Sequence, residues 1–239
     1  MLLLIALLPI LSAQPDRFGL PACQAPNLEA ATRTAFVLCH DTARKVPAWT
    51  AYELTASQLD TPTPPRPSHF RADSALQFPG ATNADYTHSG FHRGHLVPAR
   101  DLANSRETFL LSNAAPQQPS LNLGRWRQLE NAVRILAVNA DALYIVTGTL
   151  FLAPTVESIG PNHVAIPTHF YKAILVIHDG NKQMFAIILP NTTNVSEPLA
   201  HFTTTVDAIE SLTGLNLFAN LPTTEQEFLE QSRTPVPLR

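Results

Sequence analysis

Three long apolar runs in the second half of the chain largely decide its fold class. They cover Leu143–Gly148, His163–Ile177 and Met184–Leu189, and they are rich in valine, isoleucine and leucine. Runs of this composition are typical of strands in a buried sheet. An earlier segment, Trp49–Thr55, alternates in a way that suits a further strand. We therefore expect a sheet to form the core of the protein.

Helices are predicted in two places around these strands. The longest should run from Asn122 to about Asn139, because it carries an apolar stripe at helical spacing. Four residues form the stripe: Leu129, Val133, Leu136 and Ala137. A second helix should cover Thr205 to Leu212 and end at Gly214. Strands and helices in this order, within one uniform composition, predict a single domain of the α+β class.

The composition is that of a globular protein, with 239 residues of which 45% are hydrophobic and only 15% charged. Residues 1–13 form an apolar run that is too short to span a bilayer but has the length of a secretory signal ending at Ala13. A buried N-terminal strand is the alternative. We expect a signal peptide over 1–13, one domain over 14–239, and a secreted or periplasmic protein. No other stretch is long and apolar enough for a membrane helix, so the mature form is expected not to enter a membrane.

Cys23 and Cys39 are the only cysteines in the chain. In an exported protein such a pair is expected to form one disulfide. Closing a loop of this length would stabilise the fold by about 3 kcal/mol in the chain-entropy model. Two unrelated buried thiols are the alternative. A zinc or redox role is not expected, because the chain has neither CxxC spacing nor a second pair of cysteines.

Arginine is concentrated in one part of the chain. The whole sequence has a net charge of −3 and a pI of about 6.3, which argues against a general polyanion binder. Residues 91–134, in contrast, hold six arginines against three acidic residues, a local charge of +3. The planar guanidinium group suits bidentate contact with phosphate. For Arg106, Arg125 and Arg127, a solvated charged surface is an equally good interpretation.

The same segment contains the residue types that phosphodiester hydrolysis needs. His95 is largely neutral near pH 7 and can accept a proton from water. Asn122, Trp126, Glu130 and Arg134 follow one another at intervals of four, so on one helix they would lie along one edge. An amide oxygen with a carboxylate nearby suits Mg²⁺, and arginine can neutralise phosphate charge. As an alternative, Glu130 and Arg134 form only a surface ion pair.

The motifs around these residues have a regular spacing. The tripeptide Arg93-Gly94-His95 is followed by Asn113, Asn122, Glu130 and Arg134, and the last three steps are nine, eight and four residues. This pattern resembles the DNA/RNA non-specific endonucleases of the ββα-metal type, the family of mitochondrial endonuclease G and of secreted bacterial nucleases. The resemblance covers about residues 50–220. It implies a ββα-metal nuclease fold with a mixed or antiparallel central sheet flanked by helices.

The resemblance also implies roles for the motif residues. His95 would be the general base that activates water. Asn122 would be the only direct protein ligand of Mg²⁺, with Mn²⁺ as a substitute ion. Glu130 would hold the waters around the metal, and Asn113 would support the His95 loop or contact the phosphate.

Arg93 and Arg134 would contact phosphate, and an upstream arginine of the family matches either Arg66 or Arg71. Cleavage of DNA and RNA would leave 5′-phosphate and 3′-hydroxyl ends. A homodimer and an inhibitor protein are further partners that the family leaves open. The chain departs from the family at His92, which stands where the Asp-Arg-Gly-His motif begins with aspartate. Because His95, Asn122 and Glu130 are present, we expect an active enzyme.

Two other interpretations compete with this one. His88, His92 and His95 are spaced closely enough to suggest three zinc ligands, although the HExxH glutamate is missing and Gly90 and Phe91 disfavour a helix there. The other alternative is an exported, catalytically silent protein that binds nucleic acid or an inhibitor on the same scaffold. The histidine at position 92 and the modest net charge are the observations in its favour.

Overall fold

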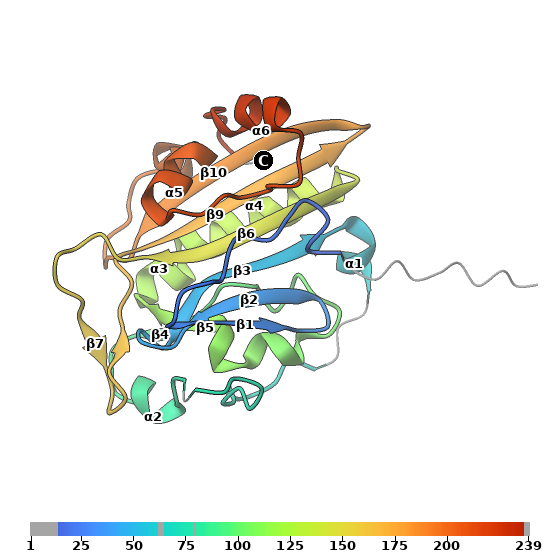
Figure 1. Ribbon diagram of the computed structural model, residues 1–239. Coiled ribbons are helices and arrows are strands. Elements are labelled where there is room, and N and C mark those ends of the chain that lie inside the picture. The colour runs from blue at the N-terminus through green and yellow to red at the C-terminus, as the bar shows by residue number, and fades with distance from the viewer. Residues whose placement is uncertain (1–13, 62–64, 79, 237–239) are drawn as a thin grey trace, which may run out of the picture.

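A seven-stranded antiparallel sheet forms the centre of the structure (Figure 1), a computed structural model that describes residues 14–61, 65–78 and 80–236. The predicted signal segment therefore lies outside the described residues. The strands follow one another across the sheet in the order β1 (Leu28–Thr32), β2 (Phe36–Asp41), β3 (Val46–Leu54), β6 (Ala142–Leu150), β9 (His169–His178), β10 (Asn181–Pro190) and β11 (Thr203–Thr204). Each neighbouring pair runs antiparallel. This agrees with the α+β class and the antiparallel sheet that were expected.

The three apolar runs become strands β6, β9 and β10, but the middle run is divided. Its first part, β8 (Val164–Ala165), pairs with β7 (Ser158–Ile159) in a separate small ribbon. Pro167 follows and has no N–H to donate to a sheet, so the long strand starts only at His169. The prediction of one continuous strand over this run was wrong for that reason.

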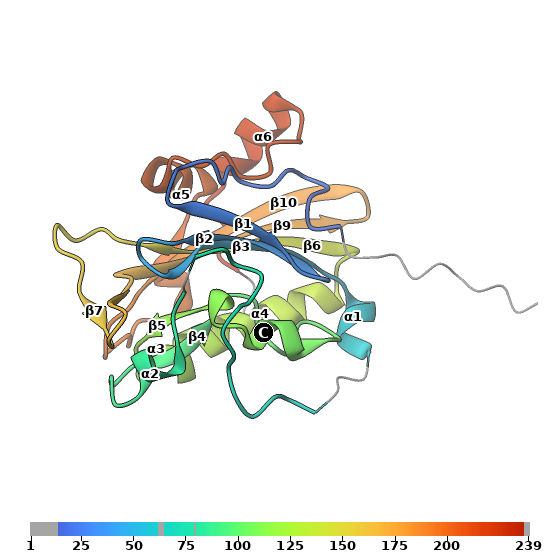
Figure 2. The same cartoon turned by 60° about the horizontal axis from the view of Figure 1, so that its bottom comes forward.

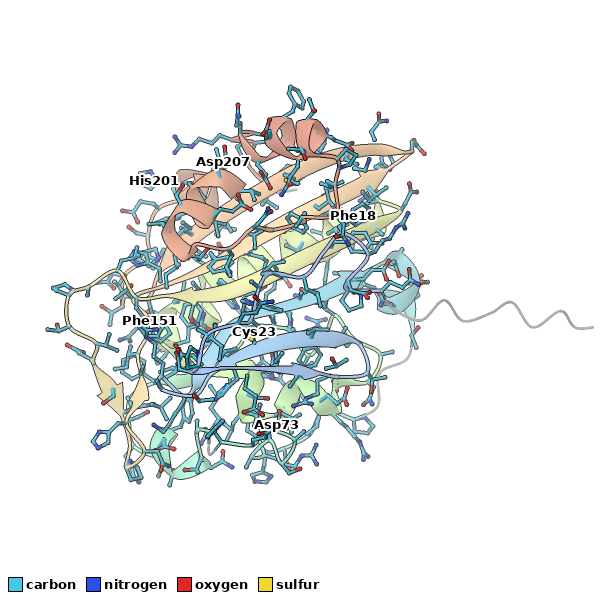
Figure 3. All side chains as sticks on the ribbon, viewed as in Figure 1. Phe18, Cys23, Asp73, Phe151, His201 and Asp207 are labelled. Carbon is cyan, nitrogen blue, oxygen red and sulfur yellow. A yellow bond between two sulfur atoms is a disulfide. The ribbon has the colours of Figure 1, made fainter. Side chains whose placement is uncertain are left out.

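The N-terminal segment contains the hairpin of β1 and β2, which was not predicted. Every residue of β2 is buried. The disulfide between Cys23 and Cys39 is present, with a Cα–Cα distance of 5.8 Å, as predicted. It fastens the segment before β1 to the second strand of the sheet (Cys23 is labelled in Figure 3).

Helices cover both faces of the sheet (Figure 2). On one face lie α3 (Pro119–Leu123) and α4 (Arg125–Val138), together with the two-stranded ribbon of β4 (His92–His95) and β5 (Ala114–Gln117). On the other face lie α5 (Val206–Thr213) and α6 (Thr223–Glu230). Two separate hydrophobic cores result, one on each side of the sheet. Two short helices, α1 (Ala56–Asp60) and α2 (Asn83–Tyr86), lie at the periphery.

The second predicted helix is confirmed, and its ends show why. The hydroxyl of Thr205 accepts a hydrogen bond from the N–H of Ala208 and caps the start of α5. Gly214 ends it with φ of 71°, a left-handed conformation that glycine adopts without strain. Helix α6 was not predicted. Among the described residues, no helix is long and apolar enough to cross a membrane.

The predicted long helix is broken in two at Gly124. This residue has φ of −104° and ψ of −109°, which no helix contains. A Cβ atom there would lie 2.4 Å from the backbone oxygen of Ser120, so only glycine fits. The break turns Asn122 onto α3, while Glu130 remains on α4. The apolar stripe itself is found as expected, with Leu129, Val133 and Ala137 buried and Leu136 packed against the same core.

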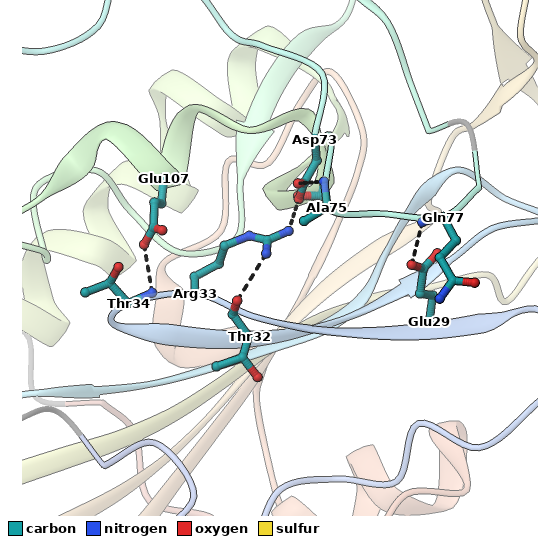
Figure 4. Close-up of polar contacts among 9 residues, drawn as sticks. Glu29, Thr32, Arg33, Thr34, Asp73, Ala75, Gln77 and Glu107 are labelled. Carbon is teal, nitrogen blue, oxygen red and sulfur yellow. Dashed lines mark hydrogen bonds and ion pairs between the residues drawn. The ribbon is translucent and has the colours of Figure 1, made fainter.

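The β1–β2 hairpin is tied, both at its turn and near the start of β1, to the loops that surround the ribbon of β4 and β5 (Figure 4). Three contacts form this tie: Arg33 with Asp73, the Thr34 N–H with Glu107 Oε2 at 2.8 Å, and the Gln77 N–H with Glu29 Oε1 at 2.6 Å. Asp73 also accepts from the hydroxyl of Ser112. The hairpin thus helps to hold the loop that delivers Arg66 and Phe70 to the site described next.

Candidate active site

The candidate site is built on two strands and a helix that are consecutive in the chain. Strand β4 pairs with β5, so that His92 faces Gln117 and His95 faces Ala114 in the register. Side chains alternate along a strand, which places Arg93 and His95 on one face of the ribbon and His92 on the other. Helix α3 follows β5 directly and brings Asn122 beside the ribbon.

A pocket of about 270 Å³ lies between the ribbon and the two helices. Five of the six predicted site residues line it: Arg93, His95, Asn122, Glu130 and Arg134. They come from β4, α3 and α4, so residues from Arg93 to Arg134 meet there. The remaining lining residues are Arg66, Phe70, Pro98, Ala99, Arg100, Leu123 and Arg127. The structure therefore brings the predicted residues together, with one exception.

The exception is Asn113, which is fully buried and does not line the pocket. Its side-chain oxygen accepts from the Val97 N–H at 3.0 Å. Its amide nitrogen donates to the backbone oxygens of Val97 and Thr108, also at 3.0 Å. Of the two roles expected for Asn113, this geometry supports the one in which it holds the chain after His95.

His95 packs against two aromatic rings that also contact each other. The ring centroids of Phe70 and Phe109 are 4.8 Å and 4.9 Å from that of His95. Burial, with a smaller contribution from the positive charge of Arg66, lowers the pKa of His95 to about 3. Its Nε2 atom is buried and has no hydrogen-bond partner among the described residues. The imidazole is thus neutral, and it lines the pocket with Nε2 turned toward the protein interior.

Asn122 is partly exposed at the pocket, and its amide nitrogen contacts His92, which does not line the pocket. The Nδ2 atom lies 3.0 Å from Nδ1 of His92. The amide oxygen of Asn122 accepts no hydrogen bond from any part of the chain that the structure describes. This contact was not foreseen, because sequence spacing gave no reason to pair position 92 with position 122.

Glu130 lies close to other buried or mostly buried charged side chains, namely Asp101, Lys172 and Arg134. Burial, with a smaller effect of Asp101, raises the pKa of Glu130 to about 7. Lys172 is completely buried, donates to Thr147 Oγ1 at 2.6 Å and lies 5.3 Å from the Trp126 ring centroid. Burial lowers the pKa of this lysine to about 8. Trp126 therefore faces the core rather than the pocket edge to which the helix pattern had assigned it.

Arg134 is held by a buried carboxylate that sequence reasoning missed. Its Nη1 atom donates to Asp101 Oδ1 at 2.7 Å, and the hydroxyl of Tyr52 donates to the other oxygen of Asp101 at 2.8 Å. Asp101 is 0% exposed, and burial raises its pKa although Arg134 opposes the shift. Its Nη2 atom donates to Asn131 Oδ1 at 2.5 Å, so two contacts within the protein hold the Arg134 guanidinium at the pocket wall.

Three further arginines surround the pocket: Arg66, Arg100 and Arg127. Between the two candidates for the upstream arginine, the structure places Arg66 there, whereas the backbone of Arg71 bridges to Leu110. Arg127 had been left undecided, although it precedes Glu130 by three residues and Arg134 by seven, which puts it on the same helix face.

The three histidines of the zinc interpretation are not brought together. His88 is exposed with φ of 57°, His92 faces Asn122, and His95 is enclosed by aromatic rings. No group of three metal-binding side chains within the described ranges contains any of them. The pocket instead offers an amide oxygen and a carboxylate, the oxygen donors that suit Mg²⁺ or Mn²⁺.

Comparison with known proteins decides the family. The model of the DNA/RNA non-specific endonucleases matches residues 16–224. The chain belongs to this family. Human mitochondrial endonuclease G is 34% identical over 221 residues, which cover 86% of the chain and 73% of that protein. Nuclease C1 of Cunninghamella echinulata var. echinulata is 35% identical over 224 residues, with 86% and 87% covered.

A solved structure agrees with the sequence comparison. The crystal structure of an EndoG/EndoGI complex matches this fold with a TM-score of 0.78 and 29% identity, covering 87% of this chain and 91% of that one. The fold is therefore the ββα-metal nuclease fold, and the strand pair β4–β5 with α3 forms its signature. As a member of the family, the chain is a nuclease, a metal-dependent hydrolase of nucleic acids. This favours the enzyme over the catalytically silent binding protein.

Proposed function

We propose that this nuclease is a Mg²⁺-dependent endonuclease that cleaves DNA and RNA to 5′-phosphate and 3′-hydroxyl ends. The convergence of His95, Asn122 and Glu130 in one arginine-rimmed pocket is the observation that supports it. Asn122 would be the direct protein ligand of the ion, Glu130 would hold the waters around it, and Mn²⁺ is expected to substitute. When bound, the ion supplies positive charge for the phosphoryl oxygens and for the leaving oxygen.

His95 acts as the general base in this proposal. The imidazole at the pocket accepts a proton from the water that attacks phosphorus, while the bond from phosphorus to the 3′ oxygen breaks and that oxygen takes up a proton from solvent. The low pKa of about 3 keeps the imidazole neutral at every pH at which the protein is expected to work. The proton that it takes up would create a buried cation, which the negative phosphate beside it can stabilise. The aromatic rings of Phe70 and Phe109 fix the imidazole for this step.

Arg93 and Arg134 bind the phosphate and stabilise the charge that develops on it. Arg134 is oriented by Asp101. Arg93 is oriented by the ring of Tyr86, 4.9 Å away, and by the backbone oxygen of Asn83 at 3.1 Å. Glu130 orders water at the ion. Contacts of this kind go to the phosphodiester and carry no base information, which explains cleavage with little sequence preference.

We also propose export, either secretion or transport to the periplasm, of one domain that spans residues 14–239. The disulfide between Cys23 and Cys39 supports an oxidising compartment. N-terminal sequencing of the protein from the culture medium or periplasm would give Gln14 as the first residue. An inhibitor protein that covers the pocket is a further candidate partner, because the related EndoG was crystallised with EndoGI.

The test of the activity is the nicking of supercoiled plasmid and the cleavage of single-stranded RNA in Mg²⁺. His95→Ala should lose at least about a hundredfold in rate, the usual contribution of a general base. His178→Ala is the matched control, because His178 is exposed at the far end of β9. Chelator should abolish cleavage, and Mg²⁺ or Mn²⁺ should restore it.

The product ends provide an independent readout. A kinase should label the new 5′ ends only after phosphatase treatment. Cleavage that persists in His95→Ala, or 5′ ends that are labelled without phosphatase, would contradict the assignment of the base or of the bond that breaks.

A further inference from the structure

We propose that His92 positions the metal ligand, by accepting a hydrogen bond from the Asn122 amide and thereby turning the amide oxygen toward the ion. The inference rests on the proposed function, in which Asn122 is that ligand. It concerns the position at which this chain departs from the aspartate of the family motif.

His92 and Asn122 are in direct contact, but only Asn122 lines the pocket. His92 and His95 lie on opposite faces of the β4–β5 ribbon, and only His95 lines the pocket. Asn122 does line the pocket, and its Nδ2 atom lies 3.0 Å from Nδ1 of His92. The amide group thus has the imidazole on one side and the pocket on the other. With the nitrogen directed at His92, the oxygen is directed at the pocket.

The ribbon that carries His92 is held firmly in place. A Cβ atom at Gly94 would lie 2.4 Å from Oε1 of Gln117, so the two strands are in close contact next to the histidine. On the other side, the break at Gly124 fixes the direction of the short helix with Asn122. The contact of 3.0 Å therefore joins two rigid elements and not two free side chains.

An asparagine amide has a donor end and an acceptor end of nearly equal size, and only the oxygen can bind a cation. Without a partner the group can turn over and present its NH₂ to the ion. A neutral imidazole with its proton on Nε2 accepts at Nδ1 and favours the productive orientation. A carboxylate at this position would also accept from the amide, and it would add a negative charge near the ion. His92 keeps the positioning role and omits the charge.

The test compares the Mn²⁺ affinity of full-length variants, measured by electron paramagnetic resonance of the free ion. His92→Leu removes the acceptor and should bind Mn²⁺ about tenfold or more weakly, the usual effect of losing a partner of a metal ligand. His92→Asn retains an acceptor atom close to the position of Nδ1 and should bind within about threefold of the wild type, and His92→Asp at least as well. His201→Leu is the matched control, because His201 is exposed and belongs to no group of potential metal ligands among the described residues. Long-range ¹H–¹⁵N correlation spectra should show His92 with its proton on Nε2.

Unchanged affinity in His92→Leu, an equal loss in all three variants, or a proton on Nδ1 of His92 would each overturn the inference. If His92→Leu does not fold, the two polar variants and the spectrum decide. Asn122→Ala separates this inference from the proposal beneath it. If Asn122→Ala binds Mn²⁺ like the wild type, the ligand assignment fails and the positioning role with it. If only Asn122→Ala loses affinity, the ligand assignment stands and the role of His92 is refuted.

Discussion

Replacing Asn113 by alanine should lower the stability of this nuclease. The side chain is buried and does not line the pocket, so the change removes no direct contact with substrate. The side chain makes three buried hydrogen bonds of 3.0 Å, one with the Val97 N–H and two with the backbone oxygens of Val97 and Thr108. A buried polar group that loses its partner costs about 1–3 kcal/mol. Water can enter the cavity left by the change and recover part of this. We expect Asn113→Ala to lower the free energy of unfolding by about 3–5 kcal/mol.

Urea titration at pH 7 with the disulfide intact measures the effect. The loss is a large part of the total stability of a typical domain, about 5–15 kcal/mol, so the unfolding midpoint should fall clearly. Asn181→Ala is the matched control, because Asn181 is exposed at the start of β10, and it should change stability by no more than about 0.5 kcal/mol. Nicking by Asn113→Ala should be slower even well below its melting temperature, because Val97 follows His95 by two residues.

One result would refute this reasoning. If Asn113→Ala unfolds at the midpoint of the wild type but loses cleavage, the three hydrogen bonds do not support the loop. Asn113 would then act on the phosphate, which was the other role expected of it.

Three further predictions concern other parts of the molecule. Replacing both Cys23 and Cys39 by alanine should lower the free energy of unfolding by about 3 kcal/mol, as urea titration would show, and an unchanged midpoint would contradict a stabilising role of the disulfide. Burial lowers the pKa of His40 to about 4, so the unfolded chain binds an extra proton below pH 6.5 and stability is lost as the pH falls from 6.5 toward 4. His40→Leu should reduce the loss between pH 7 and pH 4.5 by about 2 kcal/mol, and an equally steep fall in wild type and variant would exclude this histidine as its cause. Gly124→Ala would put a Cβ atom 2.4 Å from the Ser120 oxygen, so α3 must move and the nicking rate should drop at least about tenfold; a rate equal to the wild type would show that the break can relax.

Elements that are defined by local signals could be predicted from the sequence. Apolar runs predicted β6, β9 and β10, and the stop at Gly214 helped to predict α5. The β1–β2 hairpin could not be predicted in the same way, because β1 is mostly half-exposed and its pattern is weak. Its pairing is decided by long-range contacts, namely burial of β2 against β3 and the disulfide.

The candidate site, like the fold, could be predicted from the sequence only in part. The spacing of His95, Asn122, Glu130 and Arg134 was sufficient to expect that they share a pocket, and the structure places them there. The spacing assumed one continuous helix, however, and that assumption was wrong. Asn122 reaches the pocket because Gly124 breaks the helix and α3 packs on the ribbon, which only the close approach to the Ser120 oxygen reveals. The catalytic roles of these residues remain predictions.

The charges beneath the pocket link the fold to the chemistry. Lys172 and Asp101 are completely buried, and Glu130 and Arg134 are mostly so. Apolar replacement of such a group is often neutral or stabilising in other proteins, because each ion loses its hydration. Stability therefore gives no reason for four charges at the base of the pocket. Their positions do give one, since burial raises the pKa of Glu130, the positive Lys172 opposes that shift, and Asp101 orients Arg134. The buried charges make Glu130 and Arg134 ready to meet an ion and a phosphate that supply the opposite charges.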